Sequence, residues 1–126
     1  MLKTVLLVGS GGFIGSVMRY LLQYHIEKNL TSLFPWGTFT ANIAGSFLIG
    51  IIFALAERGN ILNTEWRMFL AVGVCGGFTT FSAFAYNNFT LLKQNAFLPL
   101  IINVGGNVIL GILAVYLGVV LVRMFY

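Results

Sequence analysis

Charged residues are scarce in this 126-residue chain: Asp, Glu, Lys and Arg together make up 8% of it, against about 25% in a typical soluble domain. Hydrophobic residues make up 59%, and the mean hydropathy is +0.94. The 7 Lys and Arg residues are scattered singly, without the basic runs that bind nucleic acid, so we expect no nucleic-acid partner. This composition predicts an all-α integral membrane protein that lies in a lipid bilayer.

Acidic side chains and cysteine are also rare. The three acidic residues, Glu27, Glu57 and Glu65, lie outside the long apolar runs. The chain therefore lacks the carboxylate ring of a cation channel and the buried acid of a proton-coupled exporter. Cys75 is the single cysteine, which excludes a disulfide within the chain. No group of residues resembles a metal-ligand cluster or a nucleophile with its base, and we predict that the chain is not an enzyme.

Four apolar segments are long enough to cross a membrane, since a spanning helix needs about 20 apolar residues. They cover approximately residues 5–24, 38–56, 68–92 and 97–122, and we treat residues 1–126 as a single transmembrane domain. We expect the second connection to run from Glu57 to Arg67 and the third from Lys93 to Asn95. Because the connections are short, helices adjacent in sequence should pack antiparallel.

Basic residues are nearly balanced between the two sides of the membrane. With four spans, both termini and the second connection lie on one side. The basic residues on that side are Lys3, Arg58, Arg67 and Arg123. Those on the opposite side are Lys28, Lys93 and, if its side chain extends there, Arg19. Because an excess of Lys and Arg normally marks the cytoplasmic side, one hypothesis is that the chain inserts both ways and forms an antiparallel pair. The alternative is that one or two charges suffice to orient it.

The stretch Cys75–Phe84, Cys-Gly-Gly-Phe-Thr-Thr-Phe-Ser-Ala-Phe, lies inside the third apolar segment. Two adjacent glycines and two adjacent β-branched threonines weaken a helix, and lipid offers no water to the freed backbone groups. A break of this kind is tolerated only where protein or a polar cavity covers it. We therefore predict a third helix broken near its middle, and we interpret the break as a functional site.

Polar residues inside the apolar segments recur at helical spacing. Thr38, Asn42 and Ser46 form a stripe on the second segment, and Asn103 and Asn107 form another on the fourth. A further stripe on the first segment consists of Gly12, Ser16, Arg19 and Gln23. These groups either hold helices together or converge to line a polar pathway. Since amides, hydroxyls and one Arg are good hydrogen-bond donors, such a pathway would favour an anion.

Phe81 and Phe84 lie three residues apart, directly after the break. Because the chain has 12 phenylalanines, these two could simply be core or lipid-facing residues. The alternative is that their ring edges, which carry the positive part of the aromatic quadrupole, point at an anion. A single edge contact is weak, so it would need a partner such as Asn42. One turn beyond Phe84, the same helix face carries Asn88.

The stretch Gly76–Phe84 closely resembles the central motif of the Fluc (CrcB) family of small fluoride channels. Supporting matches, in the same order and spacing, are Gly11–Gly15 followed by Arg19-Tyr20, and Gly37-Thr38 followed by Asn42 and Gly45. The resemblance covers essentially the whole chain. It implies an antiparallel, dual-topology dimer of four-helix subunits in the plasma membrane, with two pathways that export fluoride passively from the cytoplasm and so limit its toxicity.

The same resemblance implies roles for particular residues. Phe81 and Phe84 would face fluoride edge-on, with Asn42 beside them. A structural Na+ on the dimer axis would be held by the backbone carbonyls of Gly76 and Thr79. The residues assigned to the fluoride pathway are Asn42, Phe81, Phe84, Ser82, Thr38, Asn103, Asn107 and Arg19, the last near an aqueous vestibule that attracts anions.

Three positions depart from the family pattern. Asn103 and Asn107 replace an aromatic or polar residue and a serine, and Asn87 replaces a common glutamate. These differences leave open whether the chain forms a homodimer or is one non-identical subunit of a heterodimeric fluoride channel. The remaining alternatives are a small multidrug or cation exporter, for which four spans and dual topology are also familiar, and an accessory subunit with no transport of its own.

Overall fold

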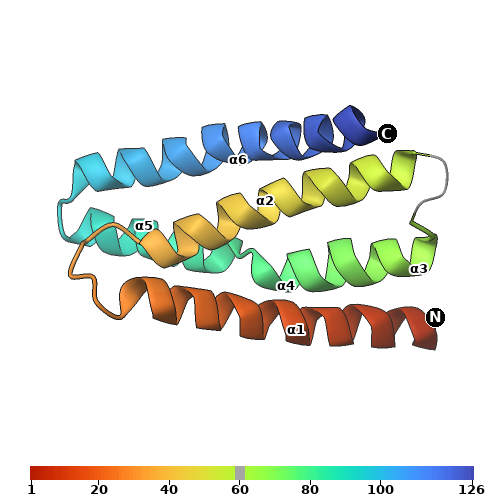
Figure 1. The fold of residues 1–126 in the computed structure, drawn as a ribbon. Helices are drawn as coiled ribbons and strands as arrows, with labels where there is room; N and C mark the ends of the chain where they lie inside the picture. The colour runs from red at the N-terminus through yellow and green to blue at the C-terminus, as the bar shows by residue number, and fades with distance from the viewer. Residues whose placement is uncertain (59–61) are drawn as a thin grey trace.

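The computed structural model describes residues 1–58 and 62–126, and all regular structure in these ranges is helical. Four helical segments are long and apolar enough to cross a membrane, namely Leu2–Glu27, Trp36–Glu57, Thr64–Lys93 and Phe97–Phe125. The two termini lie at the same end of the molecule, as four antiparallel spans require (Figure 1). The prediction of an all-helical, four-span chain is confirmed, and the protein is a multi-pass membrane protein.

Three of the spans are single helices: α1 (Leu2–Glu27), α2 (Trp36–Glu57) and α6 (Phe97–Phe125). Each extends beyond the apolar segment that we predicted from the sequence. Polar residues such as Gln and Glu are good helix formers, so a helix continues past the point where its apolar run ends. Pro35 precedes α2 as its N-cap, a position at which the lack of an N–H costs nothing.

The third span is built from several pieces: α3 (Thr64–Arg67), the π-helical stretch η1 (Met68–Cys75), α4 (Gly76–Phe78) and α5 (Phe81–Lys93). The sequence analysis placed Thr64–Arg67 in the second connection, and this was wrong. The Asn63 side chain accepts a hydrogen bond from Trp66 N at 2.9 Å, and this N-cap starts the helix earlier. Gly59 and Asn60, which we also expected in that connection, lie outside the described residues.

The connection between α5 and α6 is a tight turn, as predicted. Asn95 has a φ of 57°, the left-handed conformation that Asn adopts more readily than most residues. Asn95 N donates to Leu92 O at 3.1 Å and Ala96 N to Leu91 O at 2.9 Å. These bonds close the end of α5 and reverse the chain into α6.

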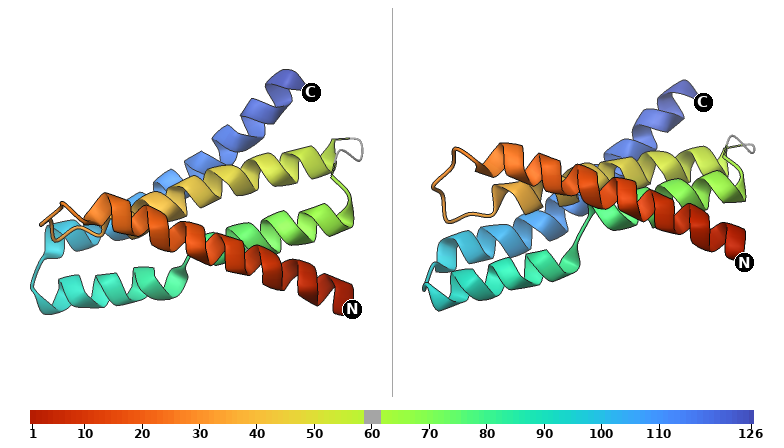
Figure 2. Two further views of the ribbon diagram at one scale, coloured as in Figure 1. Left: turned by 60° about the horizontal axis from the view of Figure 1, so that its bottom comes forward. Right: turned by 90° about the horizontal axis from the view of Figure 1, so that it is seen from below.

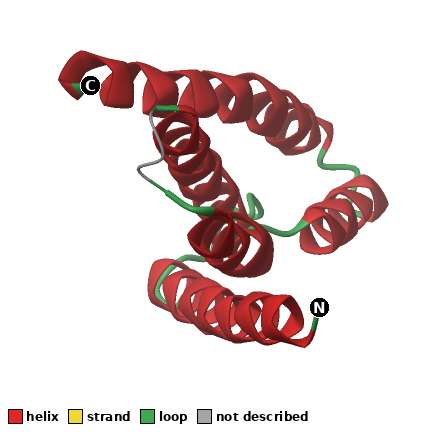
Figure 3. Ribbon diagram, turned by 90° about the vertical axis from the view of Figure 1, so that its right-hand side faces the viewer, coloured by secondary structure: helices red, strands yellow, loops and turns green. Residues whose placement is uncertain are grey.

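Two close helix pairs form most of the packing: α1 lies against η1 and α4, and α2 lies against α6 (Figures 2 and 3). Glycines make both contacts possible. A Cβ placed on Gly15 of α1 would overlap Val74 O, and one on Gly118 of α6 would overlap Phe47 O. Small residues let helix backbones approach closely in lipid, where helices gain little from the hydrophobic effect.

Candidate functional site

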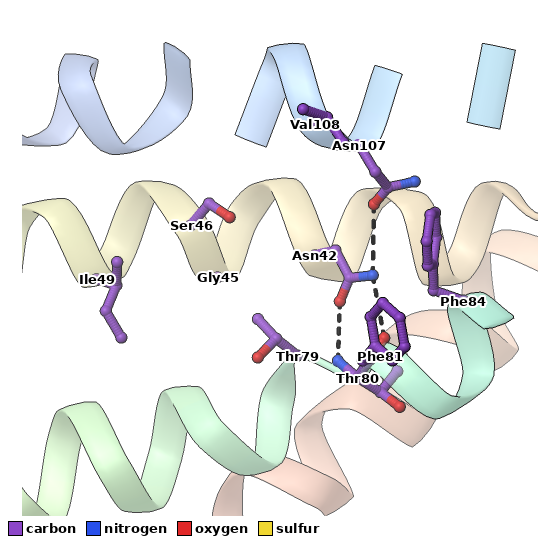
Figure 4. Close-up of a pocket in the computed structure, with 10 residues that line it drawn as sticks. All are labelled: Asn42, Gly45, Ser46, Ile49, Thr79, Thr80, Phe81, Phe84, Asn107 and Val108. Carbon is purple, nitrogen blue, oxygen red and sulfur yellow. Dashed lines mark hydrogen bonds between the residues drawn. The ribbon is translucent and has the colours of Figure 1, made fainter. Parts of the chain in front are cut away.

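A cavity of about 360 Å³ lies where α2, α6 and the start of α5 meet (Figure 4). Its lining is apolar with a few polar groups, the usual character of a small-ligand site. The lining residues are Asn42, Gly45, Ser46, Ile49, Thr79, Thr80, Phe81, Phe84, Asn107 and Val108. The cavity therefore combines part of the polar stripes of α2 and α6 with the threonines and phenylalanines that follow the two glycines.

Between α4 and α5 the backbone is extended: Thr79 has φ −90° and ψ 156°, and Thr80 has φ −151° and ψ 122°. Both hydroxyls bond to nearby backbone. Thr79 Oγ1 donates to Cys75 O at 2.9 Å, and Thr80 Oγ1 accepts from Ala83 N at 3.2 Å. β-Branched residues favour extended backbone, and hydroxyls that satisfy local backbone groups compete with the helix. The two threonines thus end one helix and cap the next.

Asn42 takes over the backbone groups that Thr80 would have paired within a helix. Thr80 N donates to Asn42 Oδ1 at 2.9 Å, and Asn42 Nδ2 donates to Thr80 O at 3.3 Å (Figure 4). A helical Thr80 N would instead donate to Gly76 O. Asn42 therefore has a structural role, which is to hold the extended segment against α2. Gly45, one turn further along α2, leaves room for it, since a Cβ there would overlap Thr79 Cγ2.

The carbonyl groups before the extended segment have different partners. Gly77 O accepts from Arg19 Nε at 3.1 Å, so the part-buried guanidinium bonds to α4. Within residues 1–58 and 62–126, the carbonyls of Gly76 and Thr79 accept no hydrogen bond. Backbone carbonyls with free lone pairs are suitable ligands for a hard cation. The two carbonyls that the family resemblance assigned to Na+ therefore fit that role chemically.

The asparagines of α6 form a network with α5. Asn103 is 1% exposed, and its Nδ2 donates to Asn88 Oδ1 at 2.8 Å. Asn107 Nδ2 donates to Asn103 O at 2.8 Å and to Asn103 Oδ1 at 2.9 Å. Asn107 in turn accepts from Asn42 Nδ2 at 3.4 Å. Of the two α6 asparagines, Asn107 lines the cavity, whereas Asn103 is buried behind it.

Phe81 and Phe84 both line the cavity. Their ring centroids are 5.7 Å apart, with 46° between the ring planes. In Figure 4 the two rings lie beside the Asn42 and Asn107 amides. Phe81 is 78% exposed in the isolated chain, which is a large apolar surface beside the cavity.

Four of the predicted pathway residues lie outside the cavity lining: Thr38, Ser82, Asn103 and Arg19. Thr38 is buried between α1 and α2 and accepts from Gln23 Nε2 at 3.0 Å. Ser82 is exposed, and its Oγ lies 3.2 Å from Thr80 Oγ1. Conversely, Ser46 lines the cavity although we did not assign it to the pathway. The stripe that it forms with Thr38 and Asn42 was the signal that could have identified it.

The fold and the cavity define a class: a small multi-span membrane protein with a ligand-sized cavity beside the extended residues Thr79 and Thr80. The family model described as "CrcB-like protein, Camphor Resistance (CrcB)" matches residues 6–119. The chain belongs to this family.

Similar curated proteins are each named "Fluoride-specific ion channel FluC". The one from Leptospira interrogans serovar Copenhageni is 43% identical over 123 residues, covering 98% of this chain and 97% of its own. The one from Phocaeicola vulgatus is 46% identical over 118 residues, covering 94% and 97%. A third, from Flavobacterium psychrophilum, is 39% identical over 122 residues, covering 97% and 98%.

Proposed function

We propose that the protein is a fluoride-selective channel of the plasma membrane that lets fluoride leave the cytoplasm passively. The observation that carries this proposal is the cavity at the interrupted third span, where the Asn42 amide and the Phe81 and Phe84 rings meet. The family match and the relatives named as fluoride channels support it. An inside-negative potential assists export of an anion by about 2.3 kcal/mol per charge per 100 mV.

The difficult step for such a channel is the dehydration of a small anion, which needs replacement donors in a narrow path. Asn42 Nδ2 is the suitable donor, because its bonds to Thr80 O and Asn107 Oδ1 are long, at 3.3 and 3.4 Å. A fluoride ion could replace either acceptor and form a shorter, charge-assisted bond. The neighbouring ring edges would add weak attraction for an anion. Chloride, a larger and weaker acceptor, would gain less from the same groups.

An antiparallel, dual-topology homodimer is the assembly that we propose. It is supported by the near balance of basic residues on the two sides of the membrane. It would also cover apolar surface of the single chain such as Phe81, which is 78% exposed, and Phe13, which is 72% exposed. A heterodimer with a second, non-identical chain would cover the same surface, so the oligomer requires its own measurement.

A structural Na+ at the dimer axis is part of the same proposal. The carbonyls of Gly76 and Thr79 would hold it, because the extended segment leaves both without a hydrogen-bond donor among the described residues. When bound, the cation would supply a positive charge that ties the two interrupted spans together. Crosslinking or mass analysis of the purified protein, in sodium and in a larger cation such as N-methylglucamine, would show whether the dimer depends on Na+.

Ion efflux from liposomes that contain only this purified chain tests the proposed function. Under an imposed potential we expect fluoride efflux well above that of empty liposomes, with chloride efflux at the background level. Chloride passing as readily as fluoride would contradict the proposal. If neither ion moves, the channel is not formed by this chain alone, and the homodimer proposal fails.

Replacement of a pathway ring separates a channel from an accessory subunit. Phe81→Leu keeps an apolar side chain and removes the ring edges, and we expect fluoride flux to fall by about tenfold, since aromatic contacts contribute about 0.5–1.5 kcal/mol. Phe53→Leu on α2 is the matched control, because Phe53 is also exposed but does not line the cavity. Equal flux through both variants would indicate that Phe81 only contacts lipid or a neighbouring chain.

A further inference from the structure

Four asparagine amides form one continuous chain of hydrogen bonds from the extended segment to α5. It begins where Thr80 N donates to Asn42 Oδ1 at 2.9 Å, and Asn42 Nδ2 then donates to Asn107 Oδ1 at 3.4 Å. Asn107 Nδ2 donates to Asn103 Oδ1 at 2.9 Å, and Asn103 Nδ2 donates to Asn88 Oδ1 at 2.8 Å. These bonds run in one direction, from Thr80 towards Asn88, although Asn42 Nδ2 also donates back to Thr80 O at 3.3 Å.

Two backbone groups fix this direction. A backbone N–H can only donate, so Asn42 must present its oxygen to Thr80 N. A backbone carbonyl can only accept, so Asn107 must present its nitrogen to Asn103 O, at 2.8 Å. In Figure 4 the Asn107 oxygen faces Asn42 and its nitrogen points the other way. The Asn103 side chain then receives Asn107 at its oxygen, which turns its own nitrogen towards Asn88.

The direction of the chain determines which amide hydrogens remain free for a ligand. Asn107 Nδ2 already donates to two acceptors within α6, and Asn103 is almost fully buried. Asn88 takes part only through its oxygen, and within residues 1–58 and 62–126 its nitrogen meets no acceptor. The Asn88 side chain is partly exposed. The last amide therefore directs two free N–H groups away from Asn103.

Asn88 lies on the helix face that continues from the proposed pathway. It follows Phe84 by four residues on α5, which corresponds to about 6 Å along a helix axis. Beyond it, towards the turn into α6, the last turn of α5 carries the basic residue Lys93. A positive side chain near the entrance raises the local anion concentration. Asn88 thus lies along α5 between the phenylalanines and Lys93.

We propose that Asn88 is an anion-binding residue that forms a second, outer fluoride site one helical turn beyond Phe84. Its Nδ2 hydrogens coordinate the ion, while the bond from Asn103 holds its oxygen, the repulsive end of the amide, away from the ion. The site accepts a small, strongly hydrogen-bonding anion that still keeps part of its water. This inference rests on the proposed fluoride pathway.

Asn88→Asp tests the inference in the full chain reconstituted into liposomes. The side chain keeps its size and an oxygen for Asn103 Nδ2, but both N–H donors are replaced by an anionic oxygen. We expect fluoride flux to fall by about tenfold or more, because a hydrogen bond to a charged group contributes at least that factor. Asn87→Asp is the matched control: it adds the same charge one residue away but about 100° around α5, so we expect a clearly smaller loss of flux than in Asn88→Asp.

The outcomes separate the inference from the proposed function. Equal flux through both variants overturns the Asn88 site, whether both are normal or both are slow, since an equal loss would follow from added charge alone. A selective loss in Asn88→Asp, with an unchanged elution profile and melting temperature, supports the site. If Asn88→Asp is not recovered folded, Asn88→Thr takes its place; its hydroxyl still accepts from Asn103 but has one donor, and normal flux would again overturn the site. Absence of fluoride flux in the unmodified protein would overturn the proposed function, and this inference with it.

Discussion

The two halves of the third span are held in place in different ways. The N-terminal half, η1 and α4, lies with its backbone directly against α1, so that a Cβ on Gly15 would overlap Val74 O. The C-terminal half, α5, has Leu91 as its buried residue and is tied to α6 by a side-chain hydrogen bond between Asn103 and Asn88. Backbone contact fixes a position and offers nothing to a ligand. Amide contact fixes a position and leaves hydrogen-bonding groups that a ligand can use.

Gly15→Leu should break the backbone contact and have the largest effect. The added side chain has no space, because its Cβ would also lie 2.9 Å from Phe78 N, and backbone atoms cannot move aside without separating α1 from α4. We expect folded protein to be lost when the variant is purified in detergent, since overpacking at a helix contact costs at least about 1–3 kcal/mol. Gly9→Leu is the control, because a Cβ on Gly9 meets nothing within 4 Å.

A monodisperse elution profile and an unchanged melting temperature for Gly15→Leu would show that α1 is free to move away from α4. The contrast between a half of the span fixed by backbone contact and a half fixed by amide hydrogen bonds would then no longer hold. Loss of folded protein in both glycine variants would instead indicate a general intolerance of bulk on α1.

Composition alone was sufficient to predict the helical, membrane-spanning class, because about 20 consecutive apolar residues have few other stable structures. The extended segment could be located from Gly76, Gly77, Thr79 and Thr80, whose effects on a helix are local. The partners of that segment could not be predicted. Arg19 reaches Gly77 across 58 residues, and no spacing rule within one helix shows which distant carbonyl an Arg will find.

The different surroundings of Thr38, Asn42 and Ser46 could not be predicted for the same reason, because they depend on partners in other helices. Helical spacing correctly placed the three side chains along α2, but it could not show that the stripe meets different neighbours along its length. Thr38 bonds to Gln23 of α1, whereas Asn42 bonds to Thr80. Similarly, the role of Asn88 depends on Asn103, which lies on the other helix of the hairpin. Periodicity predicts which residues share a face, but tertiary contacts decide what each of them does.

Asn42→Leu should weaken the attachment of the extended segment at the start of α5 and have an intermediate effect. Leucine has a similar size but leaves Thr80 N without its acceptor, and an unsatisfied backbone donor costs about 1–3 kcal/mol. We expect a lower melting temperature together with a fluoride flux reduced by about tenfold or more, since the main donor of the cavity is also removed. Ser46→Ala is the stability control, because Ser46 lies one turn away on the same face and makes no side-chain hydrogen bond within the described residues.

If Asn42→Leu kept the stability of the unmodified protein and lost only flux, Asn42 would bind the ion without holding the extended segment. If it lost stability and kept flux, the reverse would be true. Either result would separate two roles that the structure assigns to one amide.

Arg19→Lys should have the smallest effect, and it tests the contact at the junction between the two halves of the third span. Arg19 Nε donates to Gly77 O in α4, the helix that ends just before the extended segment. Lysine keeps the positive charge but has no N–H at that point of the side chain. We expect a loss of about 1 kcal/mol in stability, measured as thermal unfolding in detergent, and nearly unchanged fluoride flux. Arg123→Lys at the end of α6 is the control for a general effect of the substitution.

If Arg19 instead attracts anions into a vestibule through its charge, Arg19→Lys would leave stability and flux intact. Only removal of the charge in Arg19→Met would then lower flux, most strongly at low ionic strength. A stability loss shared by Arg19→Lys and Arg19→Met, with flux independent of salt, would show that this arginine serves as the hydrogen-bond donor to Gly77 O. In a continuous helix the backbone N–H of Phe81 would fill that role.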